Sequence, residues 1–210
     1  ILFIGDSFTE GDGLPFDSTF VGVVQDRIRA RGGEALNAGV VSYSPIIYWK
    51  KVEDLLVRRG FQVNAVVVFI DISDIQDEAL VYQLDAKGNV ADKPLAKGWW
   101  WARNSMLYRI VRRAVLTYSP RDPFIGCGSA EFGNLQCRSA WTTSPAIMRE
   151  WGTKGLAAAD THMTKLATLL RARHLPLTVA VYPWRAQLAA DDRSSIQVHY
   201  WQAWAQREGA

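Results

Sequence analysis

Residues 65–74 read AVVVFIDISD, an uninterrupted apolar run that turns polar at its end. β-Branched and aromatic side chains dominate Ala65–Ile70, which is typical of a strand in a parallel sheet that is covered on both faces. Three further apolar runs are predicted as short strands: Ile1–Ile4, Ala35–Ala38 and Leu177–Tyr182. The sequence therefore predicts four strands, with Ala65–Ile70 covered on both faces.

Helical periodicity separates these predicted strands. Phe20, Val24 and Ile28 recur at four-residue spacing before a pair of glycines that is typical of a helix end. Similar periodicity marks residues 52–56, 106–114, 156–170 and 196–204. Strands that alternate with helices predict an α/β fold with a doubly wound, mostly parallel sheet in a flavodoxin-like three-layer α/β/α arrangement. In such a fold the functional groups gather at the carboxyl ends of the strands.

The stretch 79–150 departs from this alternation. A small hairpin with its turn at Gly88 is predicted first, and residues 118–150 have no clear period. Loops of that length are uncommon in compact domains and are usually functional. We therefore interpret 79–150 as an insertion within one domain that covers residues 1–210.

Two cysteines, Cys127 and Cys137, lie in one loop-like stretch, CGSAEFGNLQC. No Cys-x-x-Cys pair and no histidine at ligand spacing accompanies them, which argues against a zinc site. A local disulfide is the favoured interpretation, and closing such a loop would stabilise the fold by roughly 3 kcal/mol. That bond predicts a periplasmic or secreted protein. Two unpaired thiols in a cytosolic protein are the alternative.

Composition excludes several classes of partner. The net charge is +3 and the basic residues are dispersed, which gives no support for nucleic-acid binding. No apolar run reaches the ~18–20 residues that a membrane span needs, and no signal peptide is recognisable, so any leader or anchor is expected outside this sequence. Phosphate-binding loops and a Gly-x-Gly-x-x-Gly turn are missing, so no cofactor is expected.

Polar or glycine residues follow three of the predicted strands. They are Gly5-Asp6-Ser7, Asn37-Ala38-Gly39 and Asp71-Ile72-Ser73-Asp74. A serine at a sharp strand-to-helix turn holds its hydroxyl above the sheet, close to backbone N–H groups at the start of a helix. Such donors stabilise the oxyanion that forms during acyl transfer.

The segment Phe3–Gly13, FIGDSFTEGDG, resembles the first block of the SGNH, or GDSL, hydrolase superfamily, and Asn37-Ala38-Gly39 resembles the second. The resemblance implies an SGNH-type fold and a serine esterase or O-acyltransferase. It also implies that Ser7 is the nucleophile. The oxyanion donors would be the N–H groups of Ser7 and Gly39, together with a side chain of the third block.

The third block departs from the family pattern Gly-x-Asn-Asp. Asp71 stands at the glycine position and Ser73 at the asparagine position, followed by Asp74. Losing an oxyanion donor costs about 2.7–4 kcal/mol in the barrier. Either Ser73 or a water replaces the lost donor, or the enzyme is slower, or Asp71 and Asp74 have a role specific to this branch of the family. Asp6, Asp71 and Asp74 are candidate substrate-binding residues. A simple polar turn in which Asp74 caps the next helix is the alternative.

The general base is also missing from its expected place. The family takes it from an Asp-x-x-His block, and no such block occurs in this sequence. His162, His174 and His199 are interpreted as surface or packing residues. We therefore expect a C-terminally truncated domain that, alone, hydrolyses p-nitrophenyl acetate little or not at all.

Nine tryptophans suggest either a packed core or a binding face. Trp99-Trp100-Trp101 cannot all point inward, and Trp184 follows a strand at the same sheet edge as Ser7 and is a candidate for the pocket wall. The expected substrate is a small-molecule or carbohydrate ester, with O-acetylated cell-envelope carbohydrate favoured. A non-catalytic domain that binds polysaccharide or a protein partner is the main alternative, and a flavodoxin-like binding module is a third.

Overall fold

The computed structural model describes residues 1–93, 106, 135–184, 187–188 and 195–210. Within these residues the main sheet has four parallel strands in the order β2-β1-β3-β6. Their bounds are Leu2–Ile4 (β1), Leu36–Asn37 (β2), Val66–Ile70 (β3) and Leu177–Val181 (β6). The α/β fold with a parallel sheet, predicted from the alternation of strands and helices, is confirmed.

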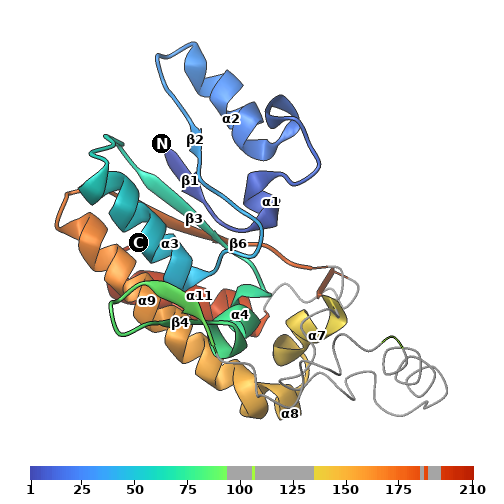
Figure 1. Ribbon diagram of the computed structural model, residues 1–210. Coiled ribbons are helices and arrows are strands. Elements are labelled where there is room, and N and C mark those ends of the chain that lie inside the picture. The colour runs from blue at the N-terminus through green and yellow to red at the C-terminus, as the bar shows by residue number, and fades with distance from the viewer. Residues whose placement is uncertain (94–105, 107–134, 185–186, 189–194) are drawn as a thin grey trace.

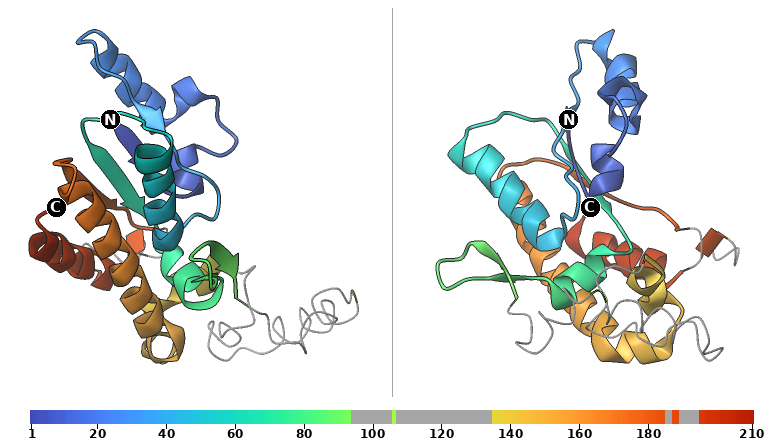
Figure 2. Two further views of the ribbon diagram at one scale, coloured as in Figure 1. Left: turned by 60° about the vertical axis from the view of Figure 1, so that its left-hand side comes forward. Right: turned by 45° about the vertical axis from the view of Figure 1, so that its right-hand side comes forward.

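Helices and helical turns connect these strands. They are α1 (Ser7–Glu10), η1 (Phe16–Ser18), α2 (Phe20–Arg29), α3 (Pro45–Glu53), η2 (Asp54–Arg58), α4 (Asp74–Leu80), α7 (Leu135–Ser139), η3 (Ala140–Thr142), α8 (Pro145–Ile147), η4 (Met148–Gly152), α9 (Thr153–Arg171) and α11 (Ile196–Glu208). In Figure 1, α2 lies apart from the group formed by α3, α9 and α11. The rotated views of Figure 2 show the same separation, with the sheet between them.

The central strand β3 explains how the two layers form. Its residues alternate between the two faces, and Val66, Val68 and Ile70 are fully buried on the side of α3, α9 and α11. Val67 and Phe69 point to the other face, where they pack with a smaller cluster around Val21 of α2. A strand that is apolar on both faces needs helices on both, which is why its sequence reads as a continuous apolar run.

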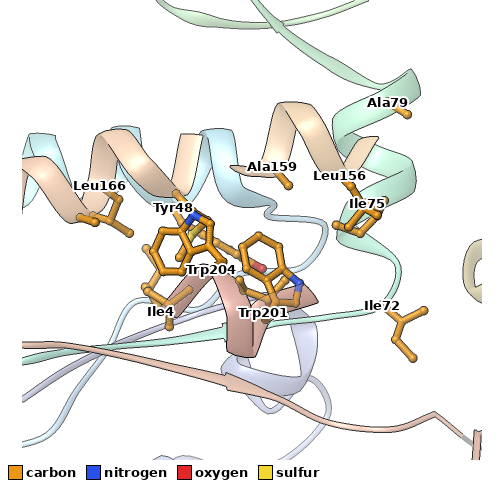
Figure 3. Packing of buried hydrophobic residues seen from close by; sticks show 14 of the residues in the cluster. Ile4, Tyr48, Ile72, Ile75, Ala79, Leu156, Ala159, Leu166, Trp201 and Trp204 are labelled. Atoms are coloured by element: carbon orange, nitrogen blue, oxygen red, sulfur yellow. The ribbon is translucent and has the colours of Figure 1, made fainter. Parts of the chain in front are cut away.

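The larger core cluster contains four tryptophans of the described residues. Trp201 and Trp204 of α11 pack edge-to-face with their ring centroids 5.7 Å apart. They lie in the same cluster as Ile4 of β1 and Tyr48 of α3, as Figure 3 shows. Trp141 of η3 and Trp151 of η4 are also buried there. Part of the high tryptophan content therefore packs the core.

The region after α4 begins with the predicted hairpin. β4 (Tyr82–Leu84) and β5 (Val90–Asp92) pair antiparallel, which confirms this prediction. The segments α7, η3, α8 and η4 then lead into α9, and η4 packs against α4. The helix predicted around residues 106–114 lies almost wholly outside the described residues. In the described part of the chain, the helices are too short or too polar to span a bilayer.

The buried hydrogen bond between η3 and the end of β3 can be tested directly. Nε1 of Trp141 donates to the carbonyl oxygen of Ile72 at 2.8 Å, and both residues are buried. Trp141→Phe leaves that carbonyl without its donor. Trp201→Phe is a matched control, because the indole N–H of Trp201 is equally buried but has no acceptor within the described part of the chain. We expect urea unfolding to show Trp141→Phe less stable than Trp201→Phe by about 1–3 kcal/mol. Equal stability of the two variants would contradict a structural role for this bond.

Candidate active site

Ser7 lies at a tight bend between a strand and a helix. Only two residues separate β1 from α1, and Ser7 is the first residue of α1. Asp6 caps the helix by accepting a hydrogen bond from the N–H of Phe8 at 3.0 Å. Glycine is required at position 5, since a Cβ there would lie 2.1 Å from Oγ1 of Thr9. Ser7 remains partly exposed while Asp6 and Thr9 are buried. The bend therefore presents the serine at the carboxyl edge of the sheet.

The N–H of Ser7 is the first backbone donor of α1. The first N–H groups of a helix have no acceptor within that helix. The N–H of Phe8 is already taken by the Asp6 carboxyl group. At the start of this helix, the Ser7 N–H is thus the donor best placed for negative charge that develops beside its own side chain.

Gly39 lies against the other end of the same helix. A Cβ at this position would lie 2.7 Å from the backbone N of Glu10, so only glycine allows the loop after β2 to approach α1 this closely. The side-chain amide of Asn37 donates to the carbonyl oxygen of Thr9 at 2.8 Å. The N–H of Gly39 in turn donates to Oδ1 of Asn37 at 3.0 Å. Gly39 therefore lies next to α1, against Thr9 and Glu10, and its N–H already has an acceptor, so its predicted role as an oxyanion donor stays a prediction.

The residues after β3 form a closed turn at the start of α4. Oδ1 of Asp71 accepts the N–H of Ser73 at 2.7 Å. Oδ2 of Asp74 accepts the N–H of Asp71 at 3.0 Å and the hydroxyl of Tyr48 at 2.7 Å. Asp74 is the first residue of α4 and its carboxyl group does not cap that helix, so the alternative interpretation of Asp74 as a cap is wrong.

Asp6, Asp71 and Asp74 form a buried cluster at the ends of β1 and β3. One carboxyl oxygen of each lies within 4.8 Å of the others, and the three side chains are at most 5% exposed. Burial, with a smaller contribution from the nearby Asp71 charge, raises the pKa of Asp6 to about 6. The same causes raise the pKa of Asp74 well above its usual range. Because these carboxyl groups are buried, little of their surface is accessible to a substrate. They support the carboxyl edge of the sheet from inside the fold.

The segment after β6 covers this cluster. The hydroxyl of Tyr182 donates to Oδ1 of Asp6 at 3.1 Å, and Nε1 of Trp184 donates to Oδ2 of Asp71 at 2.6 Å. The structure thus places Trp184 at the edge where the sequence predicts it, half-buried and fixed by an aspartate. Its indole edge is turned toward the cluster.

The donors around the cluster decide how its charge is neutralised. Aspartate oxygens are also the ligands that Mg²⁺ and Ca²⁺ prefer. Six donors, however, already point at the three carboxyl groups: the N–H groups of Phe8, Asp71 and Ser73, the hydroxyls of Tyr48 and Tyr182, and the indole of Trp184. Among the described residues, Oδ1 of Asp74 has no hydrogen-bond partner. This pattern fits hydrogen-bonded and partly protonated carboxyl groups.

His162 is paired away from Ser7. Its Nδ1 lies 2.8 Å from Oε2 of Glu78, a residue of α4 that is 1% exposed. The other oxygen of Glu78 accepts the hydroxyl of Ser44 and the N–H of Ile46. The imidazole also stacks on Trp49 with the ring centroids 6.0 Å apart. His162 is therefore a packing residue, as interpreted from the sequence, although its bond to a buried acid was not predicted.

The other two histidines do not contact Ser7 either. His174 follows α9 and precedes β6, so it lies at the amino edge of the sheet, away from Ser7. His199 is exposed on α11. Within the described residues, no histidine hydrogen-bonds to Ser7. Among the described residues, the geometry thus brings no histidine beside Ser7, whose roles as nucleophile and oxyanion donor stay predictions.

Two tyrosines of the site were not found by sequence reasoning. Tyr48 and Tyr182 each hold an aspartate of the cluster, from α3 and from the end of β6. Tyr182 does have a signal in the sequence, because it ends a predicted strand at the same edge as Ser7. Tyr48 has no such signal, because in the sequence it looks like one apolar position of a helix.

Some predicted features fall on residues that the structure does not describe. Cys127 is one of them, so its predicted disulfide with the buried Cys137 stays a prediction. The run Trp99-Trp100-Trp101 also lies outside the described residues. The insertion 79–150 is described only in part.

No protein-family model matches the chain, and no curated protein is significantly similar to it.

The raised pKa of Asp6 predicts a specific effect of pH on stability. Its folded-state pKa of about 6 exceeds the ordinary 3.8, so its protonated form favours the folded state. That contribution is present below about pH 4 and is lost as pH rises through 6. Asp6→Asn cannot ionise but keeps a side-chain oxygen for the Phe8 N–H. We expect its stability relative to wild type to increase by up to about 3 kcal/mol between pH 4 and pH 8, measured by urea unfolding.

Asp85→Asn serves as the control of opposite sign. Backbone N–H groups of Asn89 and Lys87 in the hairpin turn lower the pKa of Asp85. Its ionised form favours the folded state, so the stability of Asp85→Asn relative to wild type should decrease as pH rises. If Asp6→Asn followed the same direction, the burial of an ionisable Asp6 would be disproved.

Proposed function

We propose that this chain is an SGNH-type domain that acts on acyl esters through Ser7, as a hydrolase or an O-acyltransferase. The observation that carries the proposal is the bend after β1, where Ser7 is partly exposed at the first position of α1, directly after the buried Asp6. Its hydroxyl and its N–H both lie at the carboxyl edge of a parallel sheet, where α/β enzymes place their reactive groups. The resemblance of Phe3–Gly13 to the first SGNH block points to the same chemistry.

The reaction would proceed through an acyl-enzyme. Oγ of Ser7 attacks the ester carbonyl carbon, its proton passes to a base, and the Ser7 N–H stabilises the tetrahedral oxyanion. The C–O bond to the alcohol then breaks, and the alcohol leaves with the proton. Water or an acceptor hydroxyl takes the acyl group from Ser7 in a second, equivalent step. Gly39 would join as a donor only when its N–H turns from Asn37 to the oxyanion.

The proton acceptor is the least complete part of this site. His162 is held by Glu78, and neither His174 nor His199 hydrogen-bonds to Ser7. We therefore propose that none of the three is the base and that the chain alone turns over slowly. Added imidazole should accelerate acylation of Ser7, because it supplies a free base to an exposed hydroxyl.

We extend the proposal to an O-acetylated carbohydrate of the cell envelope as the substrate. The half-buried Trp184 beside Asp71 supports it by placing an aromatic side chain at the same edge as Ser7. Indole faces are suitable surfaces for sugar rings. A periplasmic or secreted location belongs to the same proposal and depends on the predicted disulfide.

A non-catalytic binding domain is the second candidate. It is favoured by the engaged N–H of Gly39 and by Ser73, which replaces the asparagine of the family pattern. In that case the carboxyl edge would hold a polysaccharide or a protein segment without reacting with it.

A fluorophosphonate probe separates the two candidates. We expect wild type to be labelled at Ser7, faster with added imidazole, and Ser7→Ala to remain unlabelled, as read by mass spectrometry of the modified peptide. Ser42→Ala removes an exposed serine of the loop after β2 and should leave labelling unchanged. Wild type that stays unlabelled at pH 8 with imidazole would overturn the acyl-transfer proposal and leave the binding domain.

A further inference from the structure

Tyr182 connects the end of β6 to the start of the helix that carries Ser7. Its hydroxyl donates to Oδ1 of Asp6 at 3.1 Å. Its ring packs on Phe8 with the ring centroids 5.1 Å apart. The same Oδ1 accepts the N–H of Phe8 and so caps α1. One tyrosine therefore contacts the residues on both sides of Ser7, although 175 positions separate it from the serine.

We propose that Tyr182 is a positioning residue for Ser7: its hydroxyl holds Asp6 as an ionised cap and thereby fixes the first turn of α1. The inference rests on the acyl-transfer function proposed above. Tyr182 does not need to touch the substrate, since it acts through Asp6.

The surroundings of Asp6 explain why a neutral hydroxyl matters there. Asp71 from the end of β3 and Asp74 from α4 both place a carboxyl group close to it. Tyr48 of α3 holds Asp74 on the far side, and the charge of Arg138 in α7 acts on Asp6 from a greater distance. Arg138 itself pairs with Asp77. Among the described groups facing Asp6, Tyr182 is thus the one side chain that donates a hydrogen bond to it.

Tyr182 is suited to this role at all working pH values. Burial, followed by the charge of Asp71, raises the pKa of Tyr182 far above its usual range, so its hydroxyl stays a donor. Asp6, with a pKa of about 6, changes charge close to neutral pH. A bond to the ionised form lowers the pKa of a carboxyl group. Without the Tyr182 hydroxyl, Asp6 would take up its proton at higher pH and cap α1 more weakly.

Tyr182→Phe tests the inference because it removes the hydroxyl and keeps the ring on Phe8. We expect the midpoint of the Asp6 titration, followed by the ¹³C shift of its carboxyl carbon, to rise by about one pH unit. The rate of Ser7 labelling by a fluorophosphonate should drop several-fold near pH 7 and recover above pH 8. If the substitution only disturbed the structure, the rate of Ser7 labelling would fall by the same factor at every pH.

Tyr200→Phe is the matched control. The hydroxyl of Tyr200 in α11 also donates to an aspartate, Asp160 of α9, at 3.0 Å. That substitution should move neither the Asp6 titration nor the pH profile of labelling. A second test uses Asp6→Asn, in which no carboxyl group remains to titrate, so adding Tyr182→Phe to it should not change the pH dependence of labelling further.

The outcomes separate this inference from the proposed function. An unchanged Asp6 midpoint in folded Tyr182→Phe overturns the inference whatever the labelling shows. A raised midpoint together with a shifted labelling profile supports it. If wild type is not labelled at all, the acyl-transfer proposal and with it the positioning role fail, even where the titration shows that Tyr182 controls Asp6.

Discussion

The burial of carboxyl groups at one edge of the sheet is the constraint on which this structure depends. All of α4 except its last residue is buried, yet the helix carries Asp74, Asp77 and Glu78. An ionised carboxylate is costly to bury unless it is paired or hydrogen-bonded. Each of these three carboxyl groups has different hydrogen-bond or ion-pair partners. Tyr48 donates to Asp74, Arg138 pairs with Asp77, and His162 with a backbone N–H and a serine hydroxyl hold Glu78.

These pairings join elements that are far apart in the sequence. The partners of α4 come from α3, α7 and α9, while Asp6 and Asp71 receive theirs from the segment after β6. Burial raises the pKa of Asp77 to about 7 despite its arginine partner, which shows how strongly this region resists charge. The carboxyl edge is therefore held by hydrogen bonds and ion pairs to buried acids as well as by apolar contacts. Ser7 lies at the same edge of the sheet, directly after Asp6, and its position depends on these buried acids.

The sequence allowed the strands, the hairpin and the location of Ser7 to be predicted because each has a local cause. An apolar run such as Ala65–Ile70 needs two covered faces, and Gly5 is needed where the chain bends over Thr9. The partners of the buried acids, in contrast, cannot be recognised from the neighbouring sequence. Tyr182 and Asp6 are 176 residues apart, and His162 and Glu78 are 84 apart, so only the folded chain brings them together. Sequence reasoning accordingly named Asp6, Asp71 and Asp74, but it missed Glu78 and the two tyrosines that donate to Asp6 and Asp74.

The same constraint explains why aspartate stands at position 71, where the SGNH pattern that the sequence resembles has glycine. A glycine at position 71 would leave the indole N–H of Trp184 and the N–H of Ser73 without the acceptors that Asp71 provides. Asp71 thus ties the turn after β3 to the segment after β6, and its charge is one cause of the raised pKa of Asp6. The aspartate at this position is therefore coupled to the start of α1. Burial and then the charge of Asp71 raise the pKa of Asp6 and make the cap of the Ser7 helix sensitive to pH, and the hydrogen bond from Tyr182 lowers that pKa.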